Sequence, residues 1–235
     1  MTKTVVVIQS NYIPWRGYFD MLRLADEVIF LESVQYTRQD WRNRNRIKTP
    51  NGLIWLTIPV EARFGQAIDE TRPAQAGWVE NHIASITHAY RRAAHFDRVA
   101  PWIFSAMREA GQAAILSQIN AILLQKICSG LGIERMMHRC VDVIERSALA
   151  AMNPSERVVE LVLARGGTRY LSGPAAQDYL DVPAFQRSGI EVAWMDYSGY
   201  PDYPQLWGAF EPAVSIVDLL LNVGEDAQRY LDRSS

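Results

Sequence analysis

The sequence is poor in three features that would assign a chain of this length to a familiar class: cysteine, long apolar runs, and an excess of charge of one sign. Two cysteines, Cys128 and Cys140, among 235 residues are too few for a disulfide framework or a four-cysteine zinc site. No apolar run approaches the roughly 20 residues that cross a bilayer, and the run at 5–8 lacks the pattern of a signal peptide. The formal net charge of -2 argues against a general binder of nucleic acid or membrane surfaces. We therefore expect a cytoplasmic protein with no membrane contact and no metal site.

The near-neutral total hides a local excess of cations between residues 35 and 48. Five basic side chains there accompany a single carboxylate, Asp40; they are Arg38, Arg42, Arg44, Arg46 and Lys48. Such a concentration in a mildly acidic protein predicts a site for one specific anion, and a solvated loop is the alternative. If the run is extended, its alternate residues share a face, with Arg42, Arg44 and Arg46 on one side and Trp41, Asn43 and Asn45 on the other.

The order of strand and helix patterns predicts an α/β fold with a mostly parallel sheet. The β-branched run within 3–9 indicates a buried strand, and a helix at 18–24 and a strand at 27–31 complete a βαβ unit. Further strands are expected near residues 55, 170 and 192 and at 141–144, with a hairpin turn at Pro50-Asn51-Gly52 and a mobile loop at 63–77. A helical subregion at about 78–131 is inserted in a single α/β domain spanning residues 1–235.

Polar and aromatic side chains gather where ligands of parallel sheets bind, beyond the carboxyl ends of the strands. The turn after the first strand offers groups for hydrogen bonding and stacking: Gln9, Asn11, Tyr12, Trp15 and Tyr18. Gln35 and Tyr36 follow the second strand and are expected at the same edge of the sheet. Ser172 and Gly173 follow the strand near 170. An aromatic plug that only caps the sheet is the alternative.

The first turn resembles the corresponding turn of nucleotidylyltransferases, where a first strand runs into Pro-x-His-x-Gly-His. The nearest alignment is Pro14-Trp15-Arg16-Gly17-Tyr18, in which aromatic residues occupy both histidine positions. A nucleotidylyltransferase-like topology is therefore an open prediction. Adenylyl transfer is disfavoured because the groups that would bind the transition-state charge are missing.

The combined motifs resemble the WbqC-like protein family. The segments that carry the resemblance are 9–19, 25–26, 34–36, 41–47, 55–60, 170–173, 179–180 and 210–220. Two positions depart from the usual family pattern: Ser10 replaces a proline, and Glu32-Ser33 replaces an aspartate before Val-Gln-Tyr. The resemblance covers nearly the whole chain, from about residue 5 to residue 224.

The resemblance implies a bacterial protein whose gene lies among genes for surface polysaccharides or small-molecule pathways. It further implies transfer of glycine or a similar acyl or aminoacyl group, forming an amide on an amino sugar or another small amine in polysaccharide or natural-product biosynthesis. The arginines would hold the anionic group of a small-molecule substrate, and an acyl carrier or an aminoacyl-tRNA would serve as donor.

Three residues are candidates for catalysis: His82, Tyr36 and Asp218. His82 lies on a predicted helix, in a His…Tyr segment that the family shares, and is the candidate general base; a structural histidine is the alternative. Asp218, three residues after Ser215, fits a reactive carboxylate or a capping box. Two other functional classes stay open: a nucleotide-binding protein with nucleotidyl or phosphoryl transfer chemistry, and a non-catalytic scaffold of a pathway complex.

Overall fold

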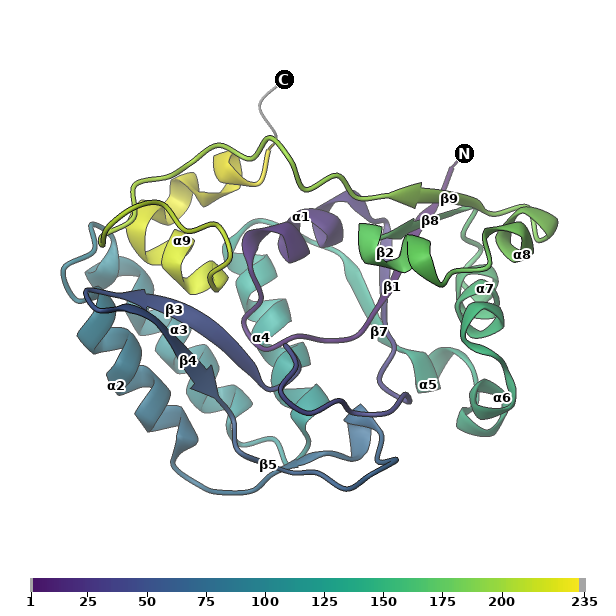
Figure 1. The fold of residues 1–235 in the computed structure, drawn as a ribbon, viewed down its shortest axis with the longest axis horizontal. Coiled ribbons are helices and arrows are strands. Elements are labelled where there is room, and N and C mark those ends of the chain that lie inside the picture. The colour runs from purple at the N-terminus through teal and green to yellow at the C-terminus, as the bar shows by residue number, and fades with distance from the viewer. Residues whose placement is uncertain (1, 233–235) are drawn as a thin grey trace. The chain divides into compact units, whose positions relative to one another are not determined.

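The computed structural model describes residues 2–232 and confirms the α/β fold, with a five-stranded parallel sheet (Figure 1). The chain divides into two compact units. Among the described residues, the first unit comprises 2–10, 20–34 and 134–198, and the second comprises 11–19, 35–133 and 199–232. The organisation as one domain over residues 1–235 stays a prediction.

The first unit is built on the parallel sheet, with the strands in the order β7-β2-β1-β8-β9. Their bounds are β1 (Thr4–Ile8), β2 (Glu27–Phe30), β7 (Met136–Arg139), β8 (Arg169–Ser172) and β9 (Glu191–Trp194). The first strand is central and its middle residues are buried, as expected for a parallel strand covered on both faces. From β7 to β1, each neighbouring strand comes earlier in the chain, and from β1 to β9 each neighbour comes later. The direction of the strand order therefore reverses between β1 and β8. A nucleotidylyltransferase-like topology beyond this order stays a prediction.

Short helices complete the first unit. They are α5 (Cys140–Val143), α6 (Arg146–Ala151), α7 (Pro154–Ala164), the 3-10 helix η2 (Pro174–Asp178) and α8 (Val182–Arg187). Helix α7 packs on β1, and α8 packs on β9. Asn153 caps α7: its side chain accepts hydrogen bonds of 3.0 Å from the backbone N–H groups of Ser155 and Glu156.

An ion cluster lies at the amino end of β2. The Glu27 carboxylate is 2.7 Å from Arg165 Nε, 2.5 Å from Lys3 Nζ and 3.2 Å from His138 Nε2. The hydrogen bond from Arg165, together with Lys3, lowers the pKa of Glu27 to about 2. The cluster joins the beginnings of β1 and β2 to the end of α7. It therefore lies at the edge of the sheet opposite the carboxyl ends of these strands.

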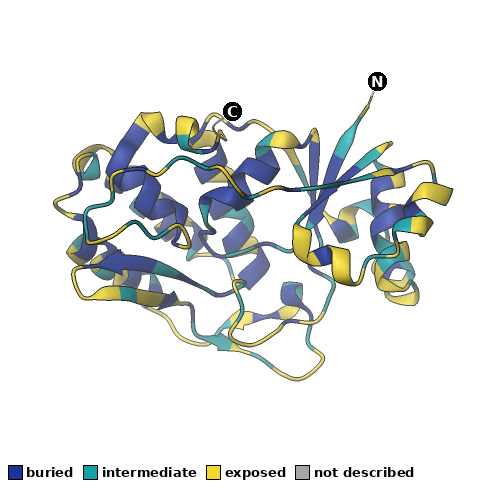
Figure 2. Cartoon of the chain, turned by 45° about the horizontal axis from the view of Figure 1, so that its top comes forward, coloured by how far each residue is buried: buried dark blue, intermediate teal, exposed yellow. Residues whose placement is uncertain are grey.

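The second unit combines a β-hairpin with most of the helices. Its elements are β3 (Arg44–Thr49), β4 (Gly52–Thr57), β5 (Val60–Glu61), η1 (Ile68–Glu70), β6 (Arg72–Pro73), α2 (Trp78–Tyr90), α3 (Phe96–Ala110), α4 (Leu116–Gly130), α9 (Ile216–Val223) and η3 (Gly224–Tyr230). Helix α1 (Arg16–Leu24) begins in this unit and ends in the first. The predicted hairpin is confirmed as an antiparallel pair of β3 and β4, separate from the parallel sheet. β3 is mostly buried and β4 mostly exposed (Figure 2).

Two local predictions were wrong. The expected strand at 141–144 is replaced by helix α5, and the strand is β7 at 136–139. β7 lies at the edge of the sheet and is partly exposed, so it tolerates polar residues and shows no apolar run. The expected loop at 63–77 contains η1 and β6, where β6 pairs with β5.

Candidate functional site

A cavity of about 230 Å³ in the second unit collects several of the predicted site residues. It is lined by Asn11, Pro14, Trp15, Trp41, Asn45 and Ala213, and we call it the Trp15–Trp41 pocket. The residues come from three separate segments: the loop before α1, the turn before and the start of β3, and the segment before α9. Ligand pockets of this kind join apolar rings to a few polar groups that fix orientation.

One wall of the pocket is a strained loop. Ile13 is fully buried and has φ of 37°, a region that β-branched residues rarely adopt. Its carbonyl accepts hydrogen bonds from Asn45 Nδ2 at 3.0 Å and from Ser215 Oγ at 2.7 Å. Asn45 Nδ2 also donates to the carbonyl of Tyr12 at 3.1 Å. These bonds hold a conformation that by itself costs about 1–3 kcal/mol.

A second strained residue, Gln39, precedes the other wall. Its φ is 58°, and its carbonyl accepts a hydrogen bond from the Arg44 guanidinium. Within residues 2–232, Ile13 and Gln39 are the non-glycine residues with positive φ, and each lies within two residues of a side chain that lines the pocket. Backbone strain of this kind concentrates at binding and catalytic sites, so it makes this pocket the candidate site.

The position of Trp15 explains the glycine in its motif. A Cβ at Gly17 would collide with the Trp15 indole, so only glycine lets the ring fold back over the start of α1. The indole also meets the Tyr200 ring edge-on, with centroids 6.2 Å apart. The sequence Trp-Arg-Gly therefore encodes one rigid aromatic wall of the pocket.

The three predicted arginines surround this pocket. Arg42 donates a hydrogen bond to Asn11 Oδ1 and lies 3.5 Å from the carboxylate of Asp40. Arg46 donates to the carbonyl of Ala213 at 3.0 Å. The guanidinium of Arg44 lies 4.1 Å from the centre of the Trp55 ring. Two of the three arginines thus bond directly to residues that line the cavity, and Asp40 is the carboxylate beside them.

The predicted alternation along this run is correct for β3 and wrong for Trp41. Asn43 and Asn45 are buried, and Asn43 Nδ2 donates to the carbonyl of Ile58 at 2.9 Å. Trp41 lies on the arginine side, because β3 begins only at Arg44 and residues 41–43 form a turn. Lys48 is buried, and its Nζ donates to Gln205 Oε1 at 2.6 Å, so it does not extend the cationic surface.

Trp55 belongs to this surface, and sequence reasoning did not place it there. It is the cross-strand partner of Arg46, and its ring centroid is 5.6 Å from that of Trp41. The two-residue turn Pro50-Asn51 sets this register, since it pairs Thr49 with Gly52. Counting outward from the predicted turn would have found the pair.

His82 contacts Tyr12, which belongs to the loop that forms one wall of the pocket. It is buried on α2; its Nε2 lies 3.1 Å from the carbonyl of Thr57, and its Nδ1 lies 2.8 Å from the hydroxyl of Tyr12. The carbonyl accepts only, so Nε2 carries the proton and Nδ1 accepts from Tyr12. Burial lowers the pKa of His82 to about 4. Both nitrogens are engaged and Tyr12 is itself fully buried, so this geometry favours a structural role over a general base.

Asp218 is fully buried at the start of α9, where its carboxylate accepts hydrogen bonds from several side chains. Four donors reach it: Tyr90 Oη at 2.7 Å, Tyr203 Oη at 2.8 Å, Gln205 Nε2 at 3.0 Å and Asn222 Nδ2 at 3.3 Å. Burial raises the pKa of Asp218. The helix is capped instead by Ser215 Oγ, which accepts from the N–H of Val217. Asp218 therefore anchors the segment that contributes Ala213 to the pocket.

The remaining predicted residues divide between the two units. Burial, and then Asp40, raises the pKa of the Tyr36 phenol, which stays protonated at neutral pH and can donate a hydrogen bond. Gln35 is exposed and pairs with Ala67, and Tyr18 is buried against Phe19. In the first unit, Gln9 follows β1, and Ser172 and Gly173 end and follow the adjacent strand β8.

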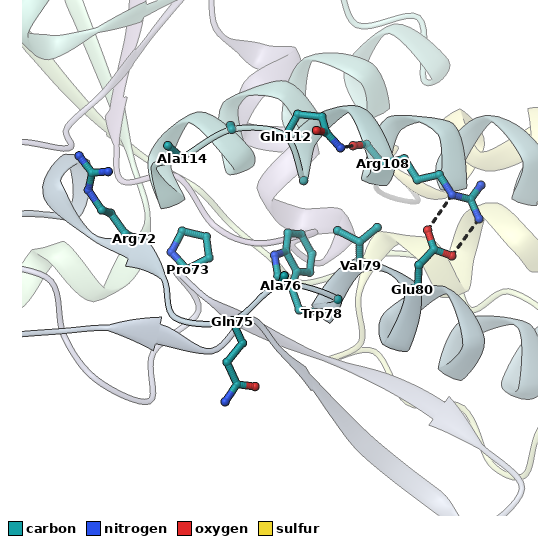
Figure 3. A pocket seen from close by; sticks show the side chains of 13 residues that line it. Arg72, Pro73, Gln75, Ala76, Trp78, Val79, Glu80, Arg108, Gln112 and Ala114 are labelled. Carbon is teal, nitrogen blue, oxygen red and sulfur yellow. Dashed lines mark hydrogen bonds and ion pairs between the residues drawn. The ribbon is translucent and has the colours of Figure 1, made fainter.

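A larger cavity of about 670 Å³ lies between segments 72–80 and 108–114 of the second unit (Figure 3). The side chains of Glu80 and Arg108, which line this cavity, are joined by hydrogen bonds of 2.8 and 3.0 Å, so their opposite charges neutralise each other.

Among residues 2–232, no cluster of three His, Cys, Asp or Glu side chains is placed to hold a metal ion. No described helix has the length and apolarity to cross a membrane.

We expect His82 to make stability depend on pH. Because its folded pKa is about 4, below the ordinary 6.5, the unfolded chain binds more protons between these values. Stability should therefore fall as pH drops from 6.5 towards 4, by on the order of 3 kcal/mol. Urea unfolding at pH 7 and pH 4.5 should show this loss in the parent protein and a smaller loss in His82→Gln. His88→Gln, on an exposed position of the same helix, is the control; an unaltered pH dependence in His82→Gln would contradict the expectation.

We expect Asp218→Asn to destabilise the protein by roughly 2–4 kcal/mol, because an amide offers one acceptor oxygen to donors that a carboxylate satisfies with two. Denaturant unfolding measures the change. Asp226→Asn is the control, since Asp226 is exposed and paired with Arg229 at the surface. Equal stability of the two variants would mean that the buried network contributes little.

Comparison with known proteins agrees with the motifs. The WbqC-like protein family matches residues 9–230. A protein of Mycobacterium tuberculosis (strain ATCC 25618 / H37Rv), named "Uncharacterized protein Rv1507c", is 46% identical over 231 residues, which cover 97% of each chain. No solved structure matches significantly. With most of its length matched, the chain belongs to the WbqC-like protein family.

Proposed function

We propose that the protein is an acyl or aminoacyl transferase that forms an amide on an amino sugar or another small amine. In this proposal the Trp15–Trp41 pocket and the arginines around it bind the anionic part of a substrate. The observation that carries it is the position of the two strained residues, Ile13 and Gln39, beside a cavity ringed by guanidinium groups. The chain belongs to the WbqC-like protein family, and the sequence resemblance to that family implies the same class of reaction.

The arginines suit an anion of defined geometry. A guanidinium can donate two parallel hydrogen bonds to a carboxylate or phosphate. The Nε atoms of Arg42, Arg44 and Arg46 are buried, so an anion would be bound through the terminal nitrogens of these guanidinium groups. The cavity of about 230 Å³ lies below the usual ligand range of about 300–1,000 Å³, which favours a small group such as one sugar ring or one acyl unit.

The proposed reaction is balanced without a cofactor. The amine nitrogen of the acceptor attacks the acyl carbon of an activated donor, a C–N bond forms, and the bond from carbon to the carrier oxygen or sulfur breaks. The carrier leaves with the electron pair, and the amine proton passes to the leaving group or to solvent. Arginine guanidinium groups and the protonated Tyr36 phenol are suited to stabilise negative charge on the acyl oxygen.

In this proposal, the pocket also contributes to catalysis by positioning the donor and the acceptor. The six residues that line the pocket include no titratable side chain, and His82 and Asp218 are not among them. Holding donor and acceptor together lowers the barrier by removing their translational freedom. The proposed donors are an acyl carrier, whose phosphate is at the far end of its prosthetic arm from the acyl group, and an aminoacyl-tRNA, whose terminal nucleotide carries both the ester and a phosphate.

The strand order of the first unit favours a second candidate, a nucleotide-binding protein with nucleotidyl or phosphoryl transfer chemistry. Open α/β sheets bind ligands where the strand order reverses, and Gln9, Ser172 and Gly173 lie at the carboxyl ends of the two strands on either side of that point. Calorimetry with a nucleotide panel separates the candidates, since tight, magnesium-dependent binding of a triphosphate favours the second.

The transferase proposal is tested at Arg46. With an activated glycyl donor and an amino sugar, we expect Arg46→Ala to lower kcat/KM by about tenfold to a hundredfold, the range for losing a charged hydrogen bond. Arg46→Lys should recover only part of the activity, because lysine keeps the positive charge but cannot donate the two parallel hydrogen bonds of a guanidinium.

Arg98→Ala is the matched control, since Arg98 is an exposed arginine whose partner is Glu225 at the surface. If the parent protein moved no glycyl or related acyl group from any activated donor to any amine, the proposal would be refuted.

A further inference from the structure

Beside the pocket, the β3–β4 hairpin and the turn before it carry a second feature, a half-exposed cluster of tryptophans and arginines. Trp41 is 41% exposed and Trp55 is 44% exposed, and their rings are 5.6 Å apart and tilted by 40°. The Arg44 guanidinium lies 4.1 Å from the Trp55 ring centre, and that of Arg46 lies 5.7 Å from Trp55 and 6.0 Å from Trp41. We call these four residues the tryptophan–arginine platform.

Packing of the hairpin does not account for the platform. The hairpin anchors itself through its other face, where Ile47 and Leu56 are buried. Indole rings left half in water forgo much of the free energy that burying them would provide. Two such rings on adjacent segments, each beside a guanidinium, therefore point to a ligand that covers them.

We propose that the platform binds a nucleoside phosphate, with the base stacked on the exposed indole surface and the phosphate held by Arg44 and Arg46. The proposal rests on the proposed transferase function, because it names the chemistry of the anionic substrate of the same site. Aromatic rings interleaved with arginines are how proteins hold unpaired bases and their phosphates. Trp41 belongs to both the platform and the pocket wall, so the group attached to the nucleotide can continue into the cavity.

The charge of the molecule limits the size of this ligand. The net charge is -2 and the cations of the platform are confined to one hairpin, so one or a few nucleotide units fit and a long nucleic-acid duplex does not. Two sources offer this chemistry: a small molecule activated by a nucleoside diphosphate, and the unpaired end of an RNA that carries an acyl group. Both present a base, a phosphate and a group for the cavity.

The test compares ligands with and without a base by calorimetry on the full chain. The probes are uridine diphosphate, adenosine diphosphate, inorganic pyrophosphate and a short single-stranded RNA ending in CCA. We expect at least one base-containing probe to bind about tenfold or more tightly than pyrophosphate, in line with the energy of one base–aromatic stack.

Variants of Trp55 separate stacking from charge. Trp55→Ala should remove the advantage of the base-containing probe over pyrophosphate, and circular dichroism should show that the variant is folded. Trp55→Phe should restore most of the advantage. Ile54→Ala is the matched control, because Ile54 is 39% exposed on the opposite face of the same strand and should bind like the parent.

Two results would overturn the nucleotide proposal: no base-containing probe exceeds pyrophosphate, or Trp55→Ala leaves the difference intact. If pyrophosphate affinity still depends on Arg46 in that case, the anion pocket of the proposed transferase survives. If no probe depends on Arg46, both proposals fail. Tighter binding of the RNA than of either diphosphate supports an RNA-borne donor, and the reverse order supports a nucleotide-activated small molecule.

Discussion

Hydrogen bonds at the start of α9 hold together the separate segments that form the pocket. The N–H of Ser215 donates to the carbonyl of Arg46 at 2.9 Å, its Oγ donates to the carbonyl of Ile13, and the N–H of Ile216 donates to the carbonyl of Pro14 at 2.8 Å. One turn later, Asp218 anchors the preceding segment. Buried polar groups left unmatched are costly, so these bonds fix both walls at once.

His82 and Asp218 are both buried, and each holds other side chains in place by hydrogen bonds. His82 fixes the hydroxyl of Tyr12, and Asp218 fixes Tyr203 and Gln205. In a sequence, a polar residue on an apolar helix looks the same whether it serves catalysis or satisfies a buried network. Only the partners distinguish the two, and these lie far away in the chain. The proposed binding surface is made instead by arginines and tryptophans on the β3–β4 hairpin and the turn before it.

Local patterns predicted the positions of several elements. The β-branched run at the start of the chain identified the central strand, and Pro50-Asn51-Gly52 identified the hairpin. The edge strand β7 was missed because half-exposed strands need no apolar run. The strain at Ile13 could not be foreseen, since isoleucine argues against positive φ and only distant hydrogen bonds hold it there. Trp55 was within reach, because the turn length already determined its cross-strand partner.

The interleaving of the two units has a consequence for how the protein can be made and altered. Along the chain, segments of the first unit alternate with segments of the second. The parallel sheet is complete only when β9 has been synthesised, and the pocket only when α9 has followed it. No single cut yields either unit intact, so neither can be expressed as a fragment or exchanged between genes as a continuous module. A gene fragment that encodes the complete sheet and the complete pocket must therefore include nearly the whole chain.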